Sequence, residues 1–212
     1  VAWVLGFLVG VGAFVAPIRW LLGKDQDHAD EMFLAGKDQG VGRYFRFTTD
    51  HKVVGIQYGL TALVFLLLGF SLMMMMRWQI AKPGQPIPIV GGLLQAALGD
   101  VAAKGVMSPD LYNSFGAMHG TIMVFLAIVP LAVGAFGNYL VPLQVGAIDM
   151  AFPRLNMASY QFYFVGGVIM LASFFIPGGA AQAGWTSYPP LANSIPTNGQ
   201  TFWLLGMVFL IT

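Results

Sequence analysis

The chain has 212 residues, of which 57% are apolar and only 9% charged, against roughly 25% charged residues in an average soluble domain. The mean hydropathy of +0.73 and the net charge of +1 exclude a disordered chain, give no reason to expect a nucleic-acid partner, and indicate an integral membrane protein. The chain contains no cysteine, which excludes disulfide bonds and thiolate metal sites.

Five apolar stretches approach or reach the roughly 20 residues that a helix needs to cross a bilayer. In chain order they are residues 1–22, 53–76, about 112–139, about 158–176 and a stretch that begins at Phe202. The sequence therefore predicts an all-α, polytopic transmembrane helix bundle with about four complete spans and the start of a fifth. Because a span that stops inside lipid leaves backbone groups unpaired, we expect the chain to be the N-terminal part of a longer protein.

Lysine and arginine are unevenly distributed over the loops between these stretches. Segment 19–52 contains six of them and segment 138–157 contains one, whereas segment 77–111 contains three and segment 177–200 none. Because alternate loops share a side of the membrane, the positive-inside rule predicts that 19–52 and 138–157 are cytoplasmic.

Helix-capping residues precede two of the spans. Thr48, Thr49 and Asp50 provide oxygen atoms that can cap the second span at its N-terminus. Ser108 followed by Pro109 is a favourable start for the third span, because proline at the first helical position needs no amide partner.

The third span also contains residues that disturb or end helices. Pro130 lies inside it and is expected to kink it. Gly137 and Asn138 suit a helix C-terminus, so we predict that the span ends there.

His119 lies inside the apolar third span, beside the small residues Gly116, Ala117 and Gly120. An imidazole in a bilayer requires a partner, and small neighbours leave room for a flat group to approach the backbone. Two interpretations are open: His119 is a ligand of haem iron, or it bonds to another helix. Its position, about 15 Å along the helix from Pro109, predicts a site in the outer half or near the middle of the membrane.

The other histidines and an arginine have simpler interpretations. His28 lies in an acidic stretch and is interpreted as a solvated loop residue, and His51 follows a capping aspartate and is interpreted as interfacial. Arg77 ends the second span on the outer side. Its guanidinium could bond a haem carbonyl or carboxylate, or simply extend to the membrane interface.

Asp149 is the single acidic residue of the loop 137–156, and Asn138 and Asn156 flank it. A carboxylate with nearby amides can form the mouth of a water-filled proton path. The alternative is a surface pair between Asp149 and Arg154, which would contribute little to stability.

Several of these residues form strings that occur in a fixed order. They are Asp50-His51-Lys52 with Gly55 and Tyr58, then Tyr112-Asn113 before His119-Gly120, the loop 137–156, and Gly184-Trp185-Thr186-Ser187-Tyr188-Pro189-Pro190-Leu191. From about Thr49 onward, the chain resembles subunit I of the haem–copper oxidases. The resemblance implies that residues 1–48 form an extra N-terminal transmembrane helix and cytoplasmic linker, and that 49–212 form the N-terminal part of the oxidase helix bundle.

The resemblance also implies roles around a low-spin haem, with haem a the expected type. His119 matches the first axial ligand of the iron, and Arg77 matches the arginine that bonds the formyl group. Tyr112 matches a position at the outer edge of this haem, and Trp185 matches the tryptophan near the propionates.

A proton pathway is implied on the opposite side. Asp149 matches the entrance of the channel used for pumping, and Asn138 and Asn156 match amides that hold water in it. The position after Asn156 is usually another asparagine in this family, whereas this chain has Met157.

The implied donor is cytochrome c. Related quinol oxidases bond the quinone at positions that correspond here to Leu68, Leu72, Leu111 and Ser114, and these side chains cannot replace the arginine, aspartate, histidine and glutamine found there. The alternatives are a quinol oxidase of the same family and a non-catalytic helical membrane subunit or transporter. Expected partners are other oxidase subunits, including a copper-bearing subunit II, and membrane lipid.

The implied activity is a proton-pumping terminal oxidase. Electrons would pass from cytochrome c through the low-spin haem to a high-spin haem and a copper ion, where oxygen is reduced to water. The ligands of that second site belong to later helices in the family, so we expect no catalytic residue in this chain and no activity from it alone. The expected location is a bacterial plasma membrane, with the mitochondrial inner membrane as the alternative.

Overall fold

The computed structural model describes residues 40–194 and 198–211. The predicted first span, residues 1–22, and His28 lie outside the described residues. Within the described residues all regular structure is helical, and the one β-type contact is an isolated bridge between Ala180 and Gly199.

Three described helices are long and apolar enough to cross a membrane. They are α4 (His51–Ala81), a continuous helix over Pro109–Val145, and Pro153–Phe175, which comprises α8 (Pro153–Ala172) and η5 (Ser173–Phe175). The stretch predicted to begin at Phe202 is a shorter apolar helix, α10 (Asn198–Ile211). The prediction of a helical membrane bundle is confirmed, and the chain is an integral membrane protein.

Helix α4 begins where the capping residues predict. The Asp50 carboxylate accepts a hydrogen bond from the Lys52 amide at 2.7 Å, and the Thr48 hydroxyl accepts one from the Asp50 amide at 3.2 Å. These bonds satisfy donors that a helix N-terminus leaves without intrahelical partners.

The helix Pro109–Val145 changes its hydrogen bonding along its length. It starts as α6 (Pro109–Thr121), whose Leu111 amide donates to the Ser108 hydroxyl at 3.2 Å, as the sequence predicts. It then adopts the wider π form in η3 (Ile122–Ile128) and η4 (Pro130–Gly137). Proline lacks an amide proton and its ring collides with the carbonyl four residues earlier, so wider turns around Pro130 are a physical response to it.

The predicted end of this span at Gly137 and Asn138 is wrong. The helix continues through α7 (Asn138–Val145), and Gly137 has helical angles, with φ of −59°. The Asn138 side chain donates back to the Gly134 carbonyl instead of ending the helix. The helix ends at Gly146, whose φ of +69° is the left-handed conformation that glycine adopts without steric cost.

The described chain forms two compact units. The first contains η1 (Val41–Phe45), α4 up to Leu63, and residues 129–165. The second contains residues 64–128 and 166–211, including α5 (Gly91–Leu98), η2 (Gly99–Gly105), α9 (Leu191–Ser194) and α10.

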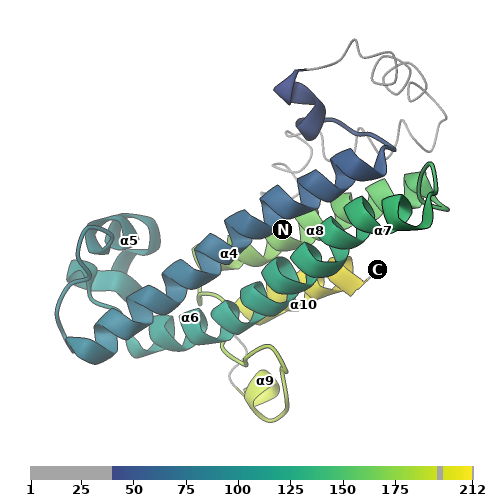
Figure 1. Cartoon of the computed structure of the whole chain (residues 1–212). Helices are drawn as coiled ribbons and strands as arrows, with labels where there is room; N and C mark the ends of the chain where they lie inside the picture. The colour runs from purple at the N-terminus through teal and green to yellow at the C-terminus, as the bar shows by residue number, and fades with distance from the viewer. Residues whose placement is uncertain (1–39, 195–197, 212) are drawn as a thin grey trace. The chain divides into compact units, whose positions relative to one another are not determined.

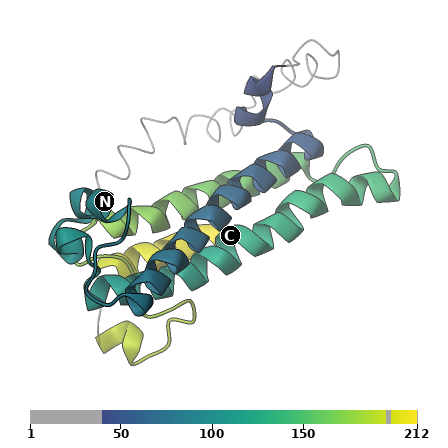
Figure 2. The same cartoon turned by 60° about the vertical axis from the view of Figure 1, so that its left-hand side comes forward.

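In the second unit, α5 folds back beside the end of α4 (Figures 1 and 2). Buried apolar side chains from α4, α6 and the segment between them form one cluster here: Met76, Ile87, Ala102, Met107, Leu111 and Phe115. This cluster fixes the end of α4 against the start of α6.

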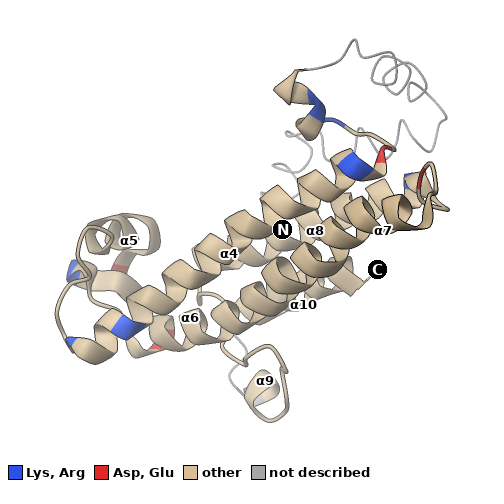
Figure 3. Cartoon of the chain, viewed as in Figure 1, with Lys and Arg blue, Asp and Glu red and all other residues tan. Residues whose placement is uncertain are grey.

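Charged residues are absent from the middle of the described helices within each unit (Figure 3). In the second unit they lie near the end of α4, in η2 and at the start of α6: Arg77, Lys82, Asp100, Lys104 and Asp110. In the first they lie in η1, at the start of α4 and around the start of α8: Arg43, Arg46, Asp50, Lys52, Asp149 and Arg154. This distribution is what a hydrocarbon environment demands.

Helices α8 and α10 touch through their backbones in the second unit. A Cβ atom on Gly166 would lie 2.9 Å from the Gly206 carbonyl oxygen, and one on Gly206 would lie 3.0 Å from the Gly166 carbonyl oxygen. A Cβ on Gly206 would also lie 2.5 Å from Cγ of Met170. Small residues at such crossings let membrane helices approach closely.

We expect Gly206→Ala to lower the thermal unfolding temperature of the full-length subunit, because the added methyl group overpacks the contact between α8 and α10. Overpacking of this kind costs about 1–3 kcal/mol. Gly92→Ala is the control, since a Cβ there meets no atom within 4 Å. Equal unfolding temperatures for both variants and the parent would contradict the backbone contact.

Candidate functional site

His119 is bonded through one ring nitrogen and leaves the other for a further partner. Its Nδ1 lies 2.8 Å from the Gly69 carbonyl oxygen of α4. A carbonyl oxygen only accepts, so Nδ1 carries the proton, and in a neutral imidazole Nε2 then carries the lone pair. The hydrogen bond to another helix that the sequence left as an alternative is therefore present, and it is compatible with a metal bond at Nε2.

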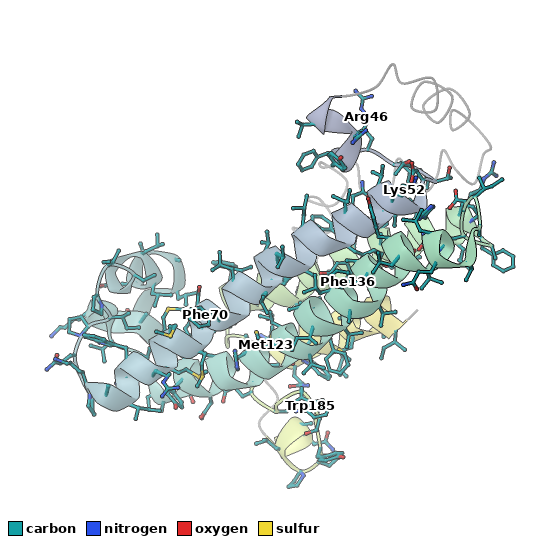
Figure 4. All side chains as sticks on the ribbon, viewed as in Figure 1. Arg46, Lys52, Phe70, Met123, Phe136 and Trp185 are labelled. Atoms are coloured by element: carbon teal, nitrogen blue, oxygen red, sulfur yellow. The ribbon has the colours of Figure 1, made fainter. Side chains whose placement is uncertain are left out.

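Glycine at position 69 brings this carbonyl close to α6. A Cβ on Gly69 would lie 2.8 Å from Sδ of Met123 and 3.2 Å from Cγ2 of Ile122. Met123 lies beside α4 on the helix that carries His119 (Figure 4). The absence of a side chain at Gly69 thus permits the helix contact on which the His119 hydrogen bond depends.

One face of α6 around His119 is lined with small and aromatic residues. Tyr112 lies seven residues, or two helical turns, before His119 and so shares its face. Tyr112 packs against the apolar cluster at the start of α6. Gly116, between them, is exposed, and a Cβ there would lie 3.7 Å from Sδ of Met76. The backbone at Gly116 is therefore open to a flat group.

Trp185 lies against the residue that follows His119. Its Cδ1 lies 3.4 Å from the position of a Cβ on Gly120, and its ring centroid lies 6.1 Å from that of Phe125. About half of its side chain is exposed, and Figure 4 shows it outside the helix that carries Met123. The structure thus brings Trp185 and the His119 turn together, although they are far apart in sequence.

Arg77 is placed differently. It lies on α4 eight residues after Gly69, about 12 Å along the helix axis, and its side chain is exposed. The structure records no hydrogen bond or ion pair of Arg77 with another described residue. Its guanidinium is therefore available, but it is not held in contact with His119.

In the first unit, Asp149 lies near the start of α4. Its carboxylate accepts a hydrogen bond from the Met150 amide at 2.6 Å. Burial raises the pKa of Asp149, and Asp50 adds to the rise, while hydrogen bonds from the Met150 and His51 backbones and the nearby His51 ring oppose it. The alternative surface pair is not formed, because Asp149 makes no ion pair with the described Arg154.

His51, the first residue of α4, is buried within the protein, and its predicted place at the membrane interface stays a prediction. It is 2% exposed, and its Nδ1 lies 2.8 Å from the Asn138 carbonyl oxygen. One turn further along α4, a Cβ on Gly55 would lie 3.0 Å from the Ala135 carbonyl oxygen. This close approach buries His51, and the only sequence signal for it is a glycine four residues after a polar residue.

The two asparagines that flank Asp149 in sequence carry unpaired buried atoms. Asn138 is 6% exposed, and its Nδ2 donates to the Gly134 carbonyl while its Oδ1 has no partner among the described residues. Asn156 has a buried Nδ2 that likewise has no hydrogen-bond partner among the described residues. One unpaired acceptor and one unpaired donor are suited to ordered water.

A group of hydroxyl side chains lies next to Asn156, and sequence reasoning missed it. Ser159 donates to the Asn156 carbonyl at 2.7 Å, so the Tyr58 hydroxyl, 2.9 Å from the Ser159 hydroxyl, is the donor in that second bond. Thr61 and Tyr160 form a similar pair at 3.0 Å. Met157, where the resemblance leads one to expect an amide, is fully buried.

Comparison with known proteins identifies the family. The family described as "Cytochrome C and Quinol oxidase polypeptide I" matches residues 53–212. The chain belongs to this family. Cytochrome c oxidase subunit 1 of Thermostichus vulcanus is 45% identical over 169 residues, which are 80% of this chain and 27% of that protein. The subunit 1 of Synechocystis sp. is 42% identical over the same shares.

A third relative comes from a different group of bacteria. The putative cytochrome c oxidase subunit 1-beta of Streptomyces coelicolor is 42% identical over 163 residues, or 76% of this chain and 25% of that protein. The chain therefore spans about a quarter of the length of these oxidase subunits. The resemblance stated from the sequence is confirmed at the level of the family.

The raised pKa of Asp149 predicts how pH affects stability. A carboxyl group whose pKa is higher in the folded than in the unfolded state destabilises the fold once it ionises. Stability from this group is therefore complete below the ordinary pKa of 3.8 and is lost as pH rises through the folded pKa. The quantity to measure is the unfolding temperature of the Asp149→Asn variant minus that of the parent subunit. We expect this difference to increase as pH rises from 3.8 through the folded-state pKa of Asp149, and to level off above it. A difference that does not vary with pH would contradict the shift.

Proposed function

We propose that this chain is the N-terminal part of the catalytic subunit of a proton-pumping cytochrome c oxidase. In this proposal it supplies one axial ligand of a low-spin haem and the residues at which pumped protons are taken up. The observation that carries the proposal is the bonding of His119 within an apolar helix, with Nδ1 committed to a carbonyl and Nε2 left as a lone-pair donor.

The residues around His119 fit a haem. A neutral imidazole nitrogen is a common haem ligand, and the backbone hydrogen bond at Nδ1 orients the ring and raises its basicity. The exposed Gly116 leaves the helix surface flat next to His119. Tyr112 on the same face and Trp185 beside Gly120 would border the macrocycle, and the Trp185 indole N–H is a donor suited to a propionate.

Arg77 has a separate role in this proposal. It carries no competing ion pair with a described residue, so its guanidinium can donate to a carbonyl oxygen at the edge of the ring. An arginine that polarises a formyl group is the reason to prefer haem a over a haem without that group.

When bound, the haem supplies one-electron transfer, and His119 would set its potential as an axial ligand. The described residues contain no group of three or more histidine, cysteine or acidic side chains suited to a metal ion. Following the family resemblance, we propose that the second haem ligand, the high-spin haem and the copper ion belong to other helices of the full subunit, and we assign no catalytic residue to this chain.

Proton uptake is proposed at Asp149. A carboxyl group with a raised pKa exchanges protons closer to neutral pH than an ordinary aspartate. The unpaired Oδ1 of Asn138 and Nδ2 of Asn156 would hold water behind it. Met157 contributes no polar atom at that point, so water must be held by these two amides and by the neighbouring hydroxyl groups.

The side chains at the quinol-binding positions support cytochrome c as the electron donor. Leu68 and Leu111 have no polar atoms, and the Ser114 hydroxyl is committed to the Ala180 carbonyl at 3.1 Å. The three bacterial relatives carry the name cytochrome c oxidase subunit 1, that of Streptomyces coelicolor as a putative one. A copper-bearing subunit II, further oxidase subunits and lipid are the proposed partners, and the bacterial relatives favour a bacterial plasma membrane.

We expect His119→Ala to abolish the low-spin haem band in the reduced-minus-oxidised spectrum of the assembled full-length subunit, because the iron loses an axial ligand. His51→Gln is a matched control, since His51 also bonds a backbone carbonyl through Nδ1 at 2.8 Å. The control should keep the band. An unchanged band in His119→Ala would refute the ligand assignment.

We expect Asp149→Asn to reduce the number of protons released per electron by reconstituted enzyme, because an amide cannot take up a proton at neutral pH. Asp100→Asn, which removes an exposed carboxylate elsewhere, should leave this ratio unchanged. Full pumping by the Asp149 variant would show that protons are taken up at another group.

A further inference from the structure

Helix α6 is held by a buried hydrogen bond that neither the family resemblance nor the haem proposal uses. The Trp203 indole N–H, on α10, donates to the Thr121 hydroxyl at 3.0 Å. Thr121 is fully buried and Trp203 is 5% exposed. The Thr121 hydroxyl donates in turn to the Ala117 carbonyl at 3.1 Å, one turn earlier in the same helix. The turn that contains His119 is therefore spanned by this bond.

This bond lies on the other side of α6 from the His119 bond. Residues two apart on an α-helix point about 200° apart around its axis. His119 is bonded to Gly69 of α4, and Thr121, two residues later, is bonded to Trp203 of α10. Two directional bonds on opposite faces restrict rotation of the helix about its axis, and all of these groups lie in the second compact unit.

We propose that Trp203 is a positioning residue for the haem ligand, which sets the rotation of α6, and thereby the direction of His119 Nε2, through the Thr121 hydroxyl. The inference rests on the proposed role of His119 as a haem ligand. It gives α10, the helix that contains the fifth predicted apolar stretch, a specific part in holding that ligand.

The geometry makes His119 sensitive to such a rotation. A side-chain tip lies roughly 5–6 Å from the helix axis, so a rotation of about 10° moves it by about 1 Å. The helix changes from α to π hydrogen bonding immediately after Thr121, in η3. The turns after Thr121 therefore do not continue the α-helical register. The rotation of the last α-helical turn is fixed by the Thr121 bonds and not by the turns that follow.

The test uses the assembled full-length subunit with three variants: Thr121→Val, Trp203→Phe and the double variant. Valine keeps the shape of threonine without its hydroxyl, and phenylalanine keeps an aromatic ring without the indole N–H. We expect each single variant to displace the low-spin haem absorption band and to change the g-values of its electron paramagnetic resonance signal. The double variant should match the single variants, because all three lose the same bond.

Two further variants separate positioning from general packing. Thr121→Ser keeps the hydroxyl and should keep the parent spectrum. Ser173→Ala also removes a fully buried hydroxyl, but that hydroxyl donates only within its own helical segment, to the Met170 carbonyl. It should therefore leave the haem signals unchanged, whatever it does to the unfolding temperature.

The proposal is overturned if Thr121→Val and Trp203→Phe lower the unfolding temperature but leave band and g-values unchanged. It is also overturned if Thr121→Ser shifts the signals as much as Thr121→Val. Failure of the underlying function has a different signature, since His119→Ala would then retain the low-spin band. Loss of the band in His119→Ala with unchanged spectra in Trp203→Phe would refute the positioning role alone.

Discussion

Hydrogen-bond donors inside an apolar helix must find acceptors within the protein, because lipid offers none. Three polar side chains on these helices, His51, His119 and Trp203, each bond a carbonyl or a hydroxyl of another described helix. His119 bonds the Gly69 carbonyl, and Trp203 bonds the Thr121 hydroxyl. These bonds are few, directional and surrounded by apolar atoms, so they decide how the helices are rotated as well as which helices meet.

Glycines make these bonds possible by allowing backbones to approach. Gly69 brings a carbonyl to His119, and Gly55 brings the following helix close enough to bury His51. In both cases the glycine matters less for its own flexibility than for the side chain it lacks. The same principle places α8 against α10 at Gly166 and Gly206.

The two described histidines show how tertiary surroundings give one residue type two roles. Both bond a backbone carbonyl through Nδ1 at 2.8 Å. His51 is almost completely enclosed and lies beside Asp149, so it acts on the carboxyl group that we assign to proton uptake. His119 is only partly buried and lies next to glycines, so its second nitrogen is the one that a flat cofactor can reach.

The sequence by itself determined the helical membrane architecture, because the length and apolarity of a span are local properties of the chain. It also pointed to His119, since a polar residue in an apolar stretch needs a partner wherever it lies, and the family resemblance pointed to Asp149; the roles of both residues stay predictions. Only the tertiary structure decided that the third span continues to Val145, that His51 is buried, and that Trp203 bonds α6. Those outcomes depend on which backbones approach one another, and apolar surfaces of similar composition do not encode that choice locally.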